Sequence, residues 1–190
     1  MFQARALRDY KILHLQHLSL DIILLVCYYL SMGDSRRFNL MASLVEKHIP
    51  KSANIADVAA GKGHLKAALY QLGYKKVTCW DRRKRLARGR PGQKYQLFDY
   101  HNAPRGYDAL VAMHPDEATD HVIFYAGKHR IPAIVCPCCV KPSASILTLE
   151  PNKHNWLIHL KKLAHDCKLE VIETILPMTG DNRVLILKPK

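Results

Sequence analysis

The segment 55–65, IADVAAGKGHL, constrains the fold of this chain more than any other part of the sequence. An apolar run ends in a turn of small residues, Gly61-Lys62-Gly63, and a helical pattern over residues 64–72 follows at once. Glycine has no Cβ and tolerates positive φ, so such a turn lets the backbone come close to a ligand. The segment is therefore typical of the ligand-binding edge of an α/β sheet.

An acidic residue after the next apolar run strengthens this interpretation. Residues 77–80 read as a strand that ends at Asp81, eighteen positions after Gly63. A nucleotide-binding α/β sheet places an acid at this point, where it accepts from a ribose hydroxyl. The alternative is a tight turn between a strand and a helix, with no ligand.

Strand and helix patterns alternate from residue 50 onward, which predicts a parallel sheet with crossover helices. Gly180, Asp181 and Asn182 form a turn signal that joins the last two strands as a hairpin, giving one antiparallel strand. We therefore predict an α/β fold: a seven-stranded, mostly parallel sheet with helices on both faces. The strands are expected near 54–59, 76–80, 94–98, 107–113, 131–136, 169–176 and 182–188, and the helices near 63–72, 116–128 and 152–166.

The N-terminal part of the chain has a different pattern. Residues 5–31 and 36–48 show helical spacing of apolar side chains, and Pro50 ends the second helix. The apolar stretch 20–30 is too short to span a bilayer and contains Asp21, so it is expected to be a buried helix, with neither a membrane anchor nor a signal peptide. We expect a helical N-terminal extension over residues 1–50 and one α/β domain over 51–190.

Charge and cysteine content indicate the partner and the compartment. The chain has 29 Lys and Arg against 16 Asp and Glu, a formal net charge of +13. An excess of this size on a small domain favours a polyanion such as RNA or DNA, with plain solubility as the alternative. The six cysteines lack the spacing of a secreted disulfide framework, which favours a reducing, cytoplasmic location.

The run Asp57-Val-Ala-Ala-Gly-Lys-Gly63 resembles the first motif, D/E-x-x-x-G-x-G, of class I, Rossmann-like methyltransferases that use S-adenosylmethionine. A dinucleotide dehydrogenase would favour glycine or alanine where this chain has Lys66. The resemblance implies that glycines make room for the methionine part of the cofactor, and that acids meet its amino group, its ribose and its adenine. Each acid also has an alternative as an ordinary cap or loop residue. The expected cofactor-binding residues are Asp57, Ala59, Gly61, Gly63, Asp81, Asp99 and His114.

A second resemblance concerns the fourth and fifth strands. His114, Ala118-Thr119-Asp120 and Pro137-Cys138-Cys139 are similar to a branch that contains methyltransferase-like proteins and tRNA 2′-O-methyltransferases. His114 is interpreted either as a base or substrate contact, or as a structural histidine. Asp120 is expected to orient His114 or to cap a neighbouring loop. The candidate catalytic residues are His114, Asp116 and Asp120.

The cysteine cluster Cys136-Pro-Cys-Cys139 has three interpretations. A metal site lacks a second pair of ligands in the sequence, and covalent attack on a pyrimidine would need a thiolate. A packed turn beneath the cofactor is the expected role, because small thiols behave as compact hydrophobes. No metal is expected.

A basic run follows the second strand on the ligand side of the sheet, and it is expected to contact substrate phosphates, or else to be a solvated loop. Together these features predict a cytoplasmic S-adenosylmethionine-dependent methyltransferase that acts on RNA, such as tRNA or rRNA. The alternatives are a non-catalytic basic Rossmann-like domain that binds nucleic acid or a partner protein, and a methyltransferase for small molecules or proteins. The sequence leaves open a protein partner and the oligomeric state. The expected substrate contacts are Arg82, Arg83 and Arg85.

Overall fold

The computed structural model describes residues 34–83, 93–138 and 153–190. The chain divides into two compact units, Met1–Ser35 and Arg36–Lys190, and the second unit contains the predicted sheet. The helix expected over residues 5–31 lies outside the described residues, as do Arg85 and Cys139.

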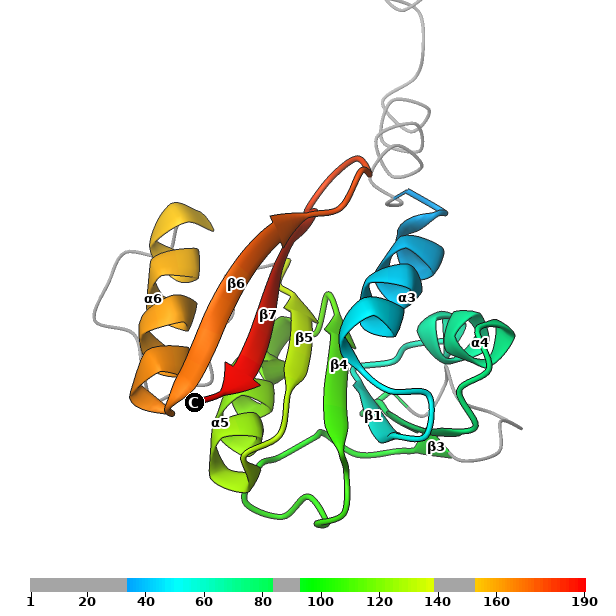
Figure 1. The fold of residues 1–190 in the computed structure, drawn as a ribbon, viewed down its shortest axis with the longest axis horizontal. Helices are drawn as coiled ribbons and strands as arrows, with labels where there is room; N and C mark the ends of the chain where they lie inside the picture. Colours follow the sequence, from blue (N-terminus) through cyan, green and yellow to red (C-terminus); the bar gives the residue numbers. More distant parts are fainter. Residues whose placement is uncertain (1–33, 84–92, 139–152) are drawn as a thin grey trace, which may run out of the picture. The chain divides into compact units, whose positions relative to one another are not determined.

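Seven strands form one sheet in the order β3-β2-β1-β4-β5-β7-β6 (Figure 1). Strands β1 to β5 run parallel to one another, and β7 runs antiparallel to both β5 and β6. This confirms the predicted seven-stranded, mostly parallel sheet that closes with a hairpin. The strands are β1 (Asn54–Val58), β2 (Lys76–Trp80), β3 (Gln93–Lys94), β4 (Ala109–Met113), β5 (Ala133–Cys136), β6 (Leu169–Ile175) and β7 (Arg183–Pro189).

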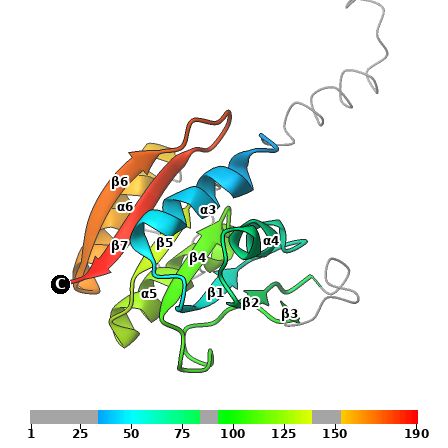
Figure 2. The same ribbon diagram turned by 45° about the vertical axis from the view of Figure 1, so that its right-hand side comes forward.

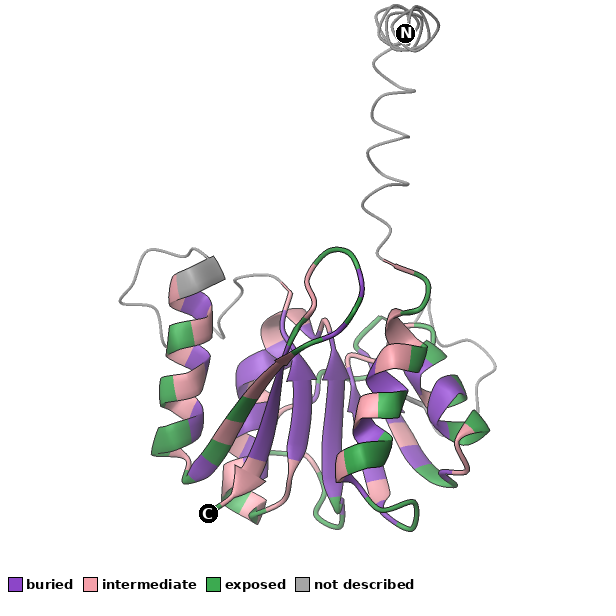
Figure 3. Ribbon diagram, turned by 45° about the horizontal axis from the view of Figure 1, so that its top comes forward, coloured by how far each residue is buried: buried purple, intermediate pink, exposed green. Residues whose placement is uncertain are grey.

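Helices cover both faces of this sheet, as Figures 1 and 2 show. Helices α3 (Arg37–His48) and α4 (His64–Gln71) supply buried side chains to one apolar core. Helices α5 (Thr119–His129) and α6 (Lys153–Asp166) supply them to a second core on the other face. The central strands are buried on both sides (Figure 3), which explains their nearly continuous apolar sequences. None of the described helices is long and apolar enough to cross a membrane.

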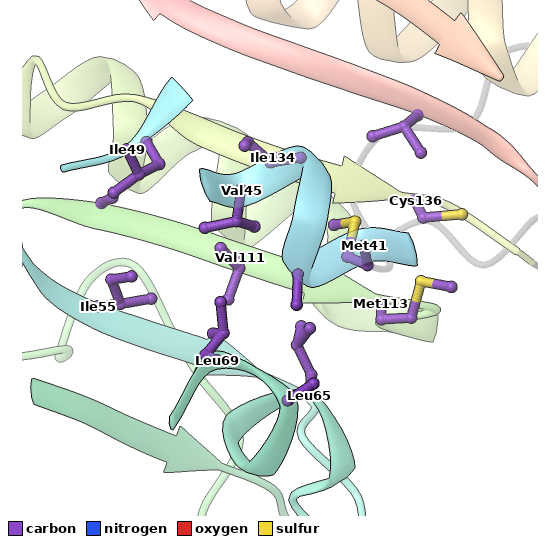
Figure 4. Close-up of a cluster of buried hydrophobic side chains, with 14 of the residues drawn as sticks. Met41, Val45, Ile49, Ile55, Leu65, Leu69, Val111, Met113, Ile134 and Cys136 are labelled. Carbon is purple, nitrogen blue, oxygen red and sulfur yellow. The ribbon is translucent and has the colours of Figure 1, made fainter. Parts of the chain in front are cut away.

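Helix α3 belongs to the α/β unit rather than to an extension. Met41, Ala42 and Val45 recur at helical spacing, and all three are buried in the same core as Ile55 and Leu69. Figure 4 shows Met41 and Val45 in this core. Without these side chains the sheet face over β1 and β4 would lose much of its apolar cover. The boundary expected at residues 50–51 is therefore corrected to residues 35–36.

Two predicted elements differ from the structure. The strand expected near 94–98 is limited to Gln93–Lys94. Tyr95 and Leu97 are exposed, so their side chains add no packing that would extend this edge strand. The helix expected from residue 116 begins at Thr119, after a short 3₁₀ turn over Asp116–Ala118. Asp116 has a φ of 51°, which is incompatible with an α-helical start.

Candidate functional site

The glycine turn between β1 and α4 is held in a left-handed backbone conformation. Ala59, Gly61 and Gly63 have φ values of 57°, 55° and 74°. The backbone N–H of Ala60 donates to the Trp80 carbonyl at 2.9 Å, which fixes the turn against the end of β2. Glycine adopts such φ values without cost, whereas Ala59 bears strain of about 1–2 kcal/mol. Strain of this kind is common where the backbone must approach a ligand.

Asp81 joins this turn to the end of β2. It is buried, and its Oδ2 accepts a hydrogen bond from the backbone N–H of Gly61 at 2.8 Å. The acid predicted from the sequence therefore lies against the glycine turn.

Arg83 forms hydrogen bonds to the same carboxylate. Its Nε donates to Oδ1 and its Nη2 to Oδ2, both at 2.9 Å, and its backbone N–H donates to Oδ1 at 2.8 Å. Burial opposes the charge on Asp81, but the hydrogen bonds from Arg83 and Gly61 outweigh it and lower the pKa of the carboxyl below its ordinary value. Arg83, predicted to contact substrate, is thus bound to the acid predicted to hold the cofactor.

A cavity of about 80 Å³ lies beside Asp81. Phe98, Pro115 and Ala118 give it apolar walls, and Ala59 borders it from the glycine turn. Arg82 and Glu117 also line this cavity and form an ion pair with each other. We call this space the first cavity. It brings together five predicted site residues: Ala59, Asp81, Arg82, Arg83 and Asp116.

Asp57 lies beneath the turn rather than at the first cavity. Its carboxyl is fully buried in β1 and accepts from the Cys79 thiol at 3.7 Å. Burial raises the pKa of Asp57 to about 7, although the bonds from Cys79 and the Lys66 backbone N–H favour its ionised form. From this position Asp57 orders the start of α4, and its predicted contact with the cofactor stays a prediction.

Asp99 is not among the residues that line the first cavity. Its carboxylate accepts from the backbone N–H of His101 at 3.0 Å and from the side chain of Asn102 at 3.2 Å. These bonds close a local turn, which corresponds to the alternative of an ordinary loop acid. The predicted contact with adenine stays a prediction, and Leu97 and Phe98 border the cavity from this segment instead.

His114 connects the end of β4 to the β6–β7 hairpin. Its Nε2 lies 2.9 Å from the Asp181 carbonyl, and its backbone N–H donates to the Cys136 carbonyl at 2.9 Å. Because a carbonyl only accepts, Nε2 carries the proton in this contact and Nδ1 is the nitrogen able to accept one. The ring therefore has a structural bond, and its predicted role as a base stays a prediction.

Asp120 is fully buried in the first turn of α5. It lines neither the first cavity nor any other described one, so its predicted catalytic role stays a prediction. Asp116, by contrast, lines the first cavity and accepts from the Cys138 thiol at 3.2 Å.

The described cysteines of the cluster have different environments. Cys136 is part of the apolar core, where burial raises its pKa to about 12, so it is a poor source of thiolate. Cys138 is half-buried and donates to Asp116. In the described part of the chain no group of three or more His, Cys, Asp or Glu is placed to hold a metal ion.

A second cavity, of about 350 Å³, was not predicted from the sequence. Its lining comes from the end of β5, from α6 and from the β6–β7 hairpin. From the sequence, Gly180 indicates the hairpin turn, and Trp156 is interpreted either as an edge of a substrate pocket or as a core residue of the helix expected over 152–166. The sequence does not indicate that these two segments meet. The lining residues are Pro137, Cys138, Trp156, Leu157, Gly180, Asp181, Asn182 and Arg183.

Several solved methyltransferases share this fold. A ribosomal protein L11 methylase from Lactobacillus delbrueckii subsp. bulgaricus is 16% identical, with a TM-score of 0.60 over 84% of this chain and 82% of that one. A TehB-like SAM-dependent methyltransferase from Corynebacterium glutamicum is 14% identical, with a TM-score of 0.53 over 80% and 87%. Magnesium protoporphyrin IX methyltransferase from Synechocystis, solved with bound SAM, is 15% identical, with a TM-score of 0.55 over 82% and 79%.

No protein-family model matches the sequence, and no curated protein matches it significantly. At identities of 14–16% the structural likeness is evidence of fold. The chain has the class I, Rossmann-like fold of S-adenosylmethionine-dependent methyltransferases.

Proposed function

We propose that this protein is an S-adenosylmethionine-dependent methyltransferase that acts on RNA. The observation that carries the proposal is the contact between Asp81 and the Gly61 backbone, at 2.8 Å, beside the first cavity. The solved structures that share the fold include a methyltransferase with bound SAM and the same enzyme with bound SAH.

The residues of the first cavity fit the cofactor. Asp81 offers the carboxylate for the two ribose hydroxyls, and Phe98 and Ala118 offer apolar surface for adenine. The left-handed turn at Ala59 and Gly61 leaves backbone room for the methionine part. Bound there, the cofactor would supply an electrophilic methyl group on a sulfonium.

Arg83 must release part of Asp81 for this fit. Both carboxylate oxygens already accept hydrogen bonds from the guanidinium, and the cavity of about 80 Å³ is smaller than the usual ligand site of roughly 300 Å³ or more. The Arg83 side chain is 45% exposed, so it can turn into solvent without crossing the core.

Methyl transfer needs the acceptor to be held in line and, for a hydroxyl or a ring atom, to lose a proton. Of the three predicted catalytic residues, Asp116 is the one that lines the first cavity. Its carboxylate is the candidate to receive that proton. His114 keeps Nδ1 as an acceptor, and its bond to the hairpin fixes the ring.

An RNA substrate is supported by the formal net charge of +13. Arg82 and Arg83 line the first cavity, but each already forms an ion pair within the chain. Arg82 pairs with Glu117, and Arg83 pairs with Asp81. Phosphate binding by these arginines therefore requires an exchange of partners. The four described cysteines are free, which agrees with a reducing compartment such as the cytoplasm.

The test is transfer of a tritiated methyl group from S-adenosylmethionine to total cellular RNA. The proposal predicts ribonuclease-sensitive label, which Asp81→Ala abolishes and the exposed-site control Asp166→Ala retains. Label that only a protease removes would contradict the RNA assignment. Cofactor binding without any transfer would favour the non-catalytic alternative.

Salt dependence gives a second readout. Binding of RNA should weaken steeply between about 50 and 200 mM salt, because phosphate contacts release counterions. Binding that ignores salt would contradict a polyanionic substrate and favour a small molecule.

A further inference from the structure

The second cavity lies at the same end of the sheet as the first. A contact joins them: Cys138 lines the second cavity, Asp116 lines the first, and the Cys138 thiol donates to the Asp116 carboxylate at 3.2 Å. The linings of the two spaces therefore touch at these two side chains. A group in the second cavity would lie next to the cofactor site.

Trp156 carries the strongest sign of a ligand in this cavity. Trp156 lines the cavity and is only 3% exposed, yet its indole Nε1 has no hydrogen-bond partner among the described residues. A buried N–H normally has a partner, because an unsatisfied donor costs about 1–3 kcal/mol. The N–H is a donor only, so the missing partner is a hydrogen-bond acceptor.

The other walls define the shape and polarity of that partner. Pro137, Leu157 and the Trp156 ring give apolar surfaces, and Trp156 is itself held by a stacked His159, with centroids 5.3 Å apart and planes at 10°. Asn182 adds a side-chain amide, and Arg183 adds a cation that is 58% exposed and forms an ion pair with Glu173 at 3.0 Å. The volume of about 350 Å³ is at the low end for ligand sites, which run from about 300 to 1,000 Å³.

We infer that the second cavity holds the acceptor nucleobase of an RNA substrate, with the Trp156 N–H donating to a ring nitrogen or carbonyl of that base. A nucleobase has flat apolar faces and acceptor-rich edges, and its phosphate is anionic. The apolar walls match the faces of the base, and the unpartnered Trp156 donor matches its acceptor edges. The exposed Arg183 matches the phosphate. This inference rests on the proposed function, because it supplies the acceptor for that methyl donor.

A lysine side chain of a protein substrate matches the cavity less well. It would bring a cation and donors only. Among the lining residues Asp181 has the one carboxylate, Arg183 beside it repels a cation, and the Trp156 donor would stay unsatisfied.

The probes are the four ribonucleoside 5′-monophosphates, with N-acetyl-lysine amide as the contrasting ligand. Binding to the full chain is measured by saturation-transfer NMR in the presence of S-adenosylhomocysteine. Trp156→Phe keeps a ring and removes the donor, and Leu157→Arg fills the cavity wall without touching Trp156. Ile158→Ala is the matched control, because Ile158 is 50% exposed on the same helix and does not line the cavity.

One nucleotide should bind best, and Trp156→Phe should weaken it about five- to tenfold, as expected for one lost hydrogen bond. Leu157→Arg should abolish the signal, while Ile158→Ala should leave it unchanged. Affinity for S-adenosylhomocysteine should stay the same in all three variants.

Absence of nucleotide binding, tighter binding of the lysine analogue, or nucleotide affinity that ignores both Trp156→Phe and Leu157→Arg would overturn the inference. Its failure is distinct from failure of the proposed function. If S-adenosylhomocysteine binds and the nucleotides do not, only the assignment of the second cavity to the acceptor base is wrong. If S-adenosylhomocysteine fails to bind while Trp156-dependent nucleotide binding persists, the base site stands and the methyltransferase does not.

Discussion

The two cavities at the carboxyl end of the sheet differ in how their polar groups are satisfied. In the first cavity every charged contact is made within the chain: Asp81 with Arg83, Arg82 with Glu117, and Asp116 with Cys138. In the second cavity the buried Nε1 of Trp156 has no partner within the described residues. The first space is small and lined by two ion pairs. The second is larger, and beside the ion pair of Arg183 with Glu173 it has a buried donor that lacks an acceptor among the described residues.

This difference indicates that the two sites bind by different routes. A ligand of the first cavity must displace Arg83 from Asp81, so its affinity includes the cost of breaking charge-assisted hydrogen bonds. A ligand of the second cavity satisfies the existing Trp156 donor, and only a phosphate contact with Arg183 would compete with an ion pair, the one to Glu173. Substitutions in the first cavity should therefore change cofactor affinity in both directions, depending on which partner of an ion pair is removed.

The largest expected effect is on cofactor binding. Asp81→Ala should weaken S-adenosylhomocysteine by about 100-fold or more, because it removes the charged acceptor of both ribose hydroxyls. Isothermal titration calorimetry measures the affinity, and circular dichroism checks the fold. An affinity like that of the wild type would remove Asp81 from the site; Asp166→Ala is the matched exposed control.

The next effect is on stability and concerns Asp57. Its pKa is raised to about 7 in the folded protein, mainly by burial, from 3.8 in the unfolded chain. Between pH 4 and pH 7 the folded state therefore binds this proton more strongly than the unfolded chain does. The contribution of Asp57 to the free energy of unfolding falls as the pH rises through this window and is constant above it. The slope is at most about 1.4 kcal/mol per pH unit.

Asp57→Asn should remove that slope. Urea unfolding at several pH values measures it, as the difference between wild type and variant. A difference that is constant from pH 4 to pH 8 would mean that Asp57 is ionised throughout. The exposed Asp166→Asn should leave the wild-type slope in place.

Arg83→Ala should act in the opposite direction to Asp81→Ala. Removing the guanidinium frees both oxygens of Asp81, so S-adenosylhomocysteine should bind about tenfold more tightly. The same titration measures it, with the exposed Lys162→Ala as control. Weaker binding would instead make Arg83 part of the cofactor site.

The smallest effect tests strain in the glycine turn. Ala59→Gly should stabilise the protein by about 0.5–1 kcal/mol, because glycine adopts a φ of 57° without strain. The larger conformational entropy of glycine in the unfolded chain offsets part of the relieved strain. Ala60→Gly, one position on, is the matched control and should destabilise. Thermal unfolding distinguishes them, and equal shifts for both variants would contradict stored strain at Ala59.

The part of the site that could be predicted from the sequence is local along the chain. The glycine turn and Asp81 lie at the ends of two neighbouring strands, so strand order alone brings them together. The same holds for the sheet: apolar runs separated by helical patterns specify parallel neighbours, and the Gly180 turn specifies the hairpin.

What could not be predicted depends on side-chain partners and on contacts between distant segments. The sequence run after Asp81 reads as an RNA-binding stretch, but Arg83 turns back two residues onto Asp81. Asp120 reads as a catalytic acid one helical turn after Asp116, but the start of α5 at Thr119 carries it into the protein interior. The second cavity combines three segments far apart in the sequence, and only the fold brings them together.

The central claim, that Asp81 and the glycine turn hold a methyl-donor cofactor, is tested most directly by calorimetric titration of the purified protein with S-adenosylmethionine and S-adenosylhomocysteine, with NAD as control. The account predicts micromolar binding of the first two, none of NAD, and loss of binding in Asp81→Ala. No binding of either methyl-donor ligand, or tighter binding of NAD, would contradict it.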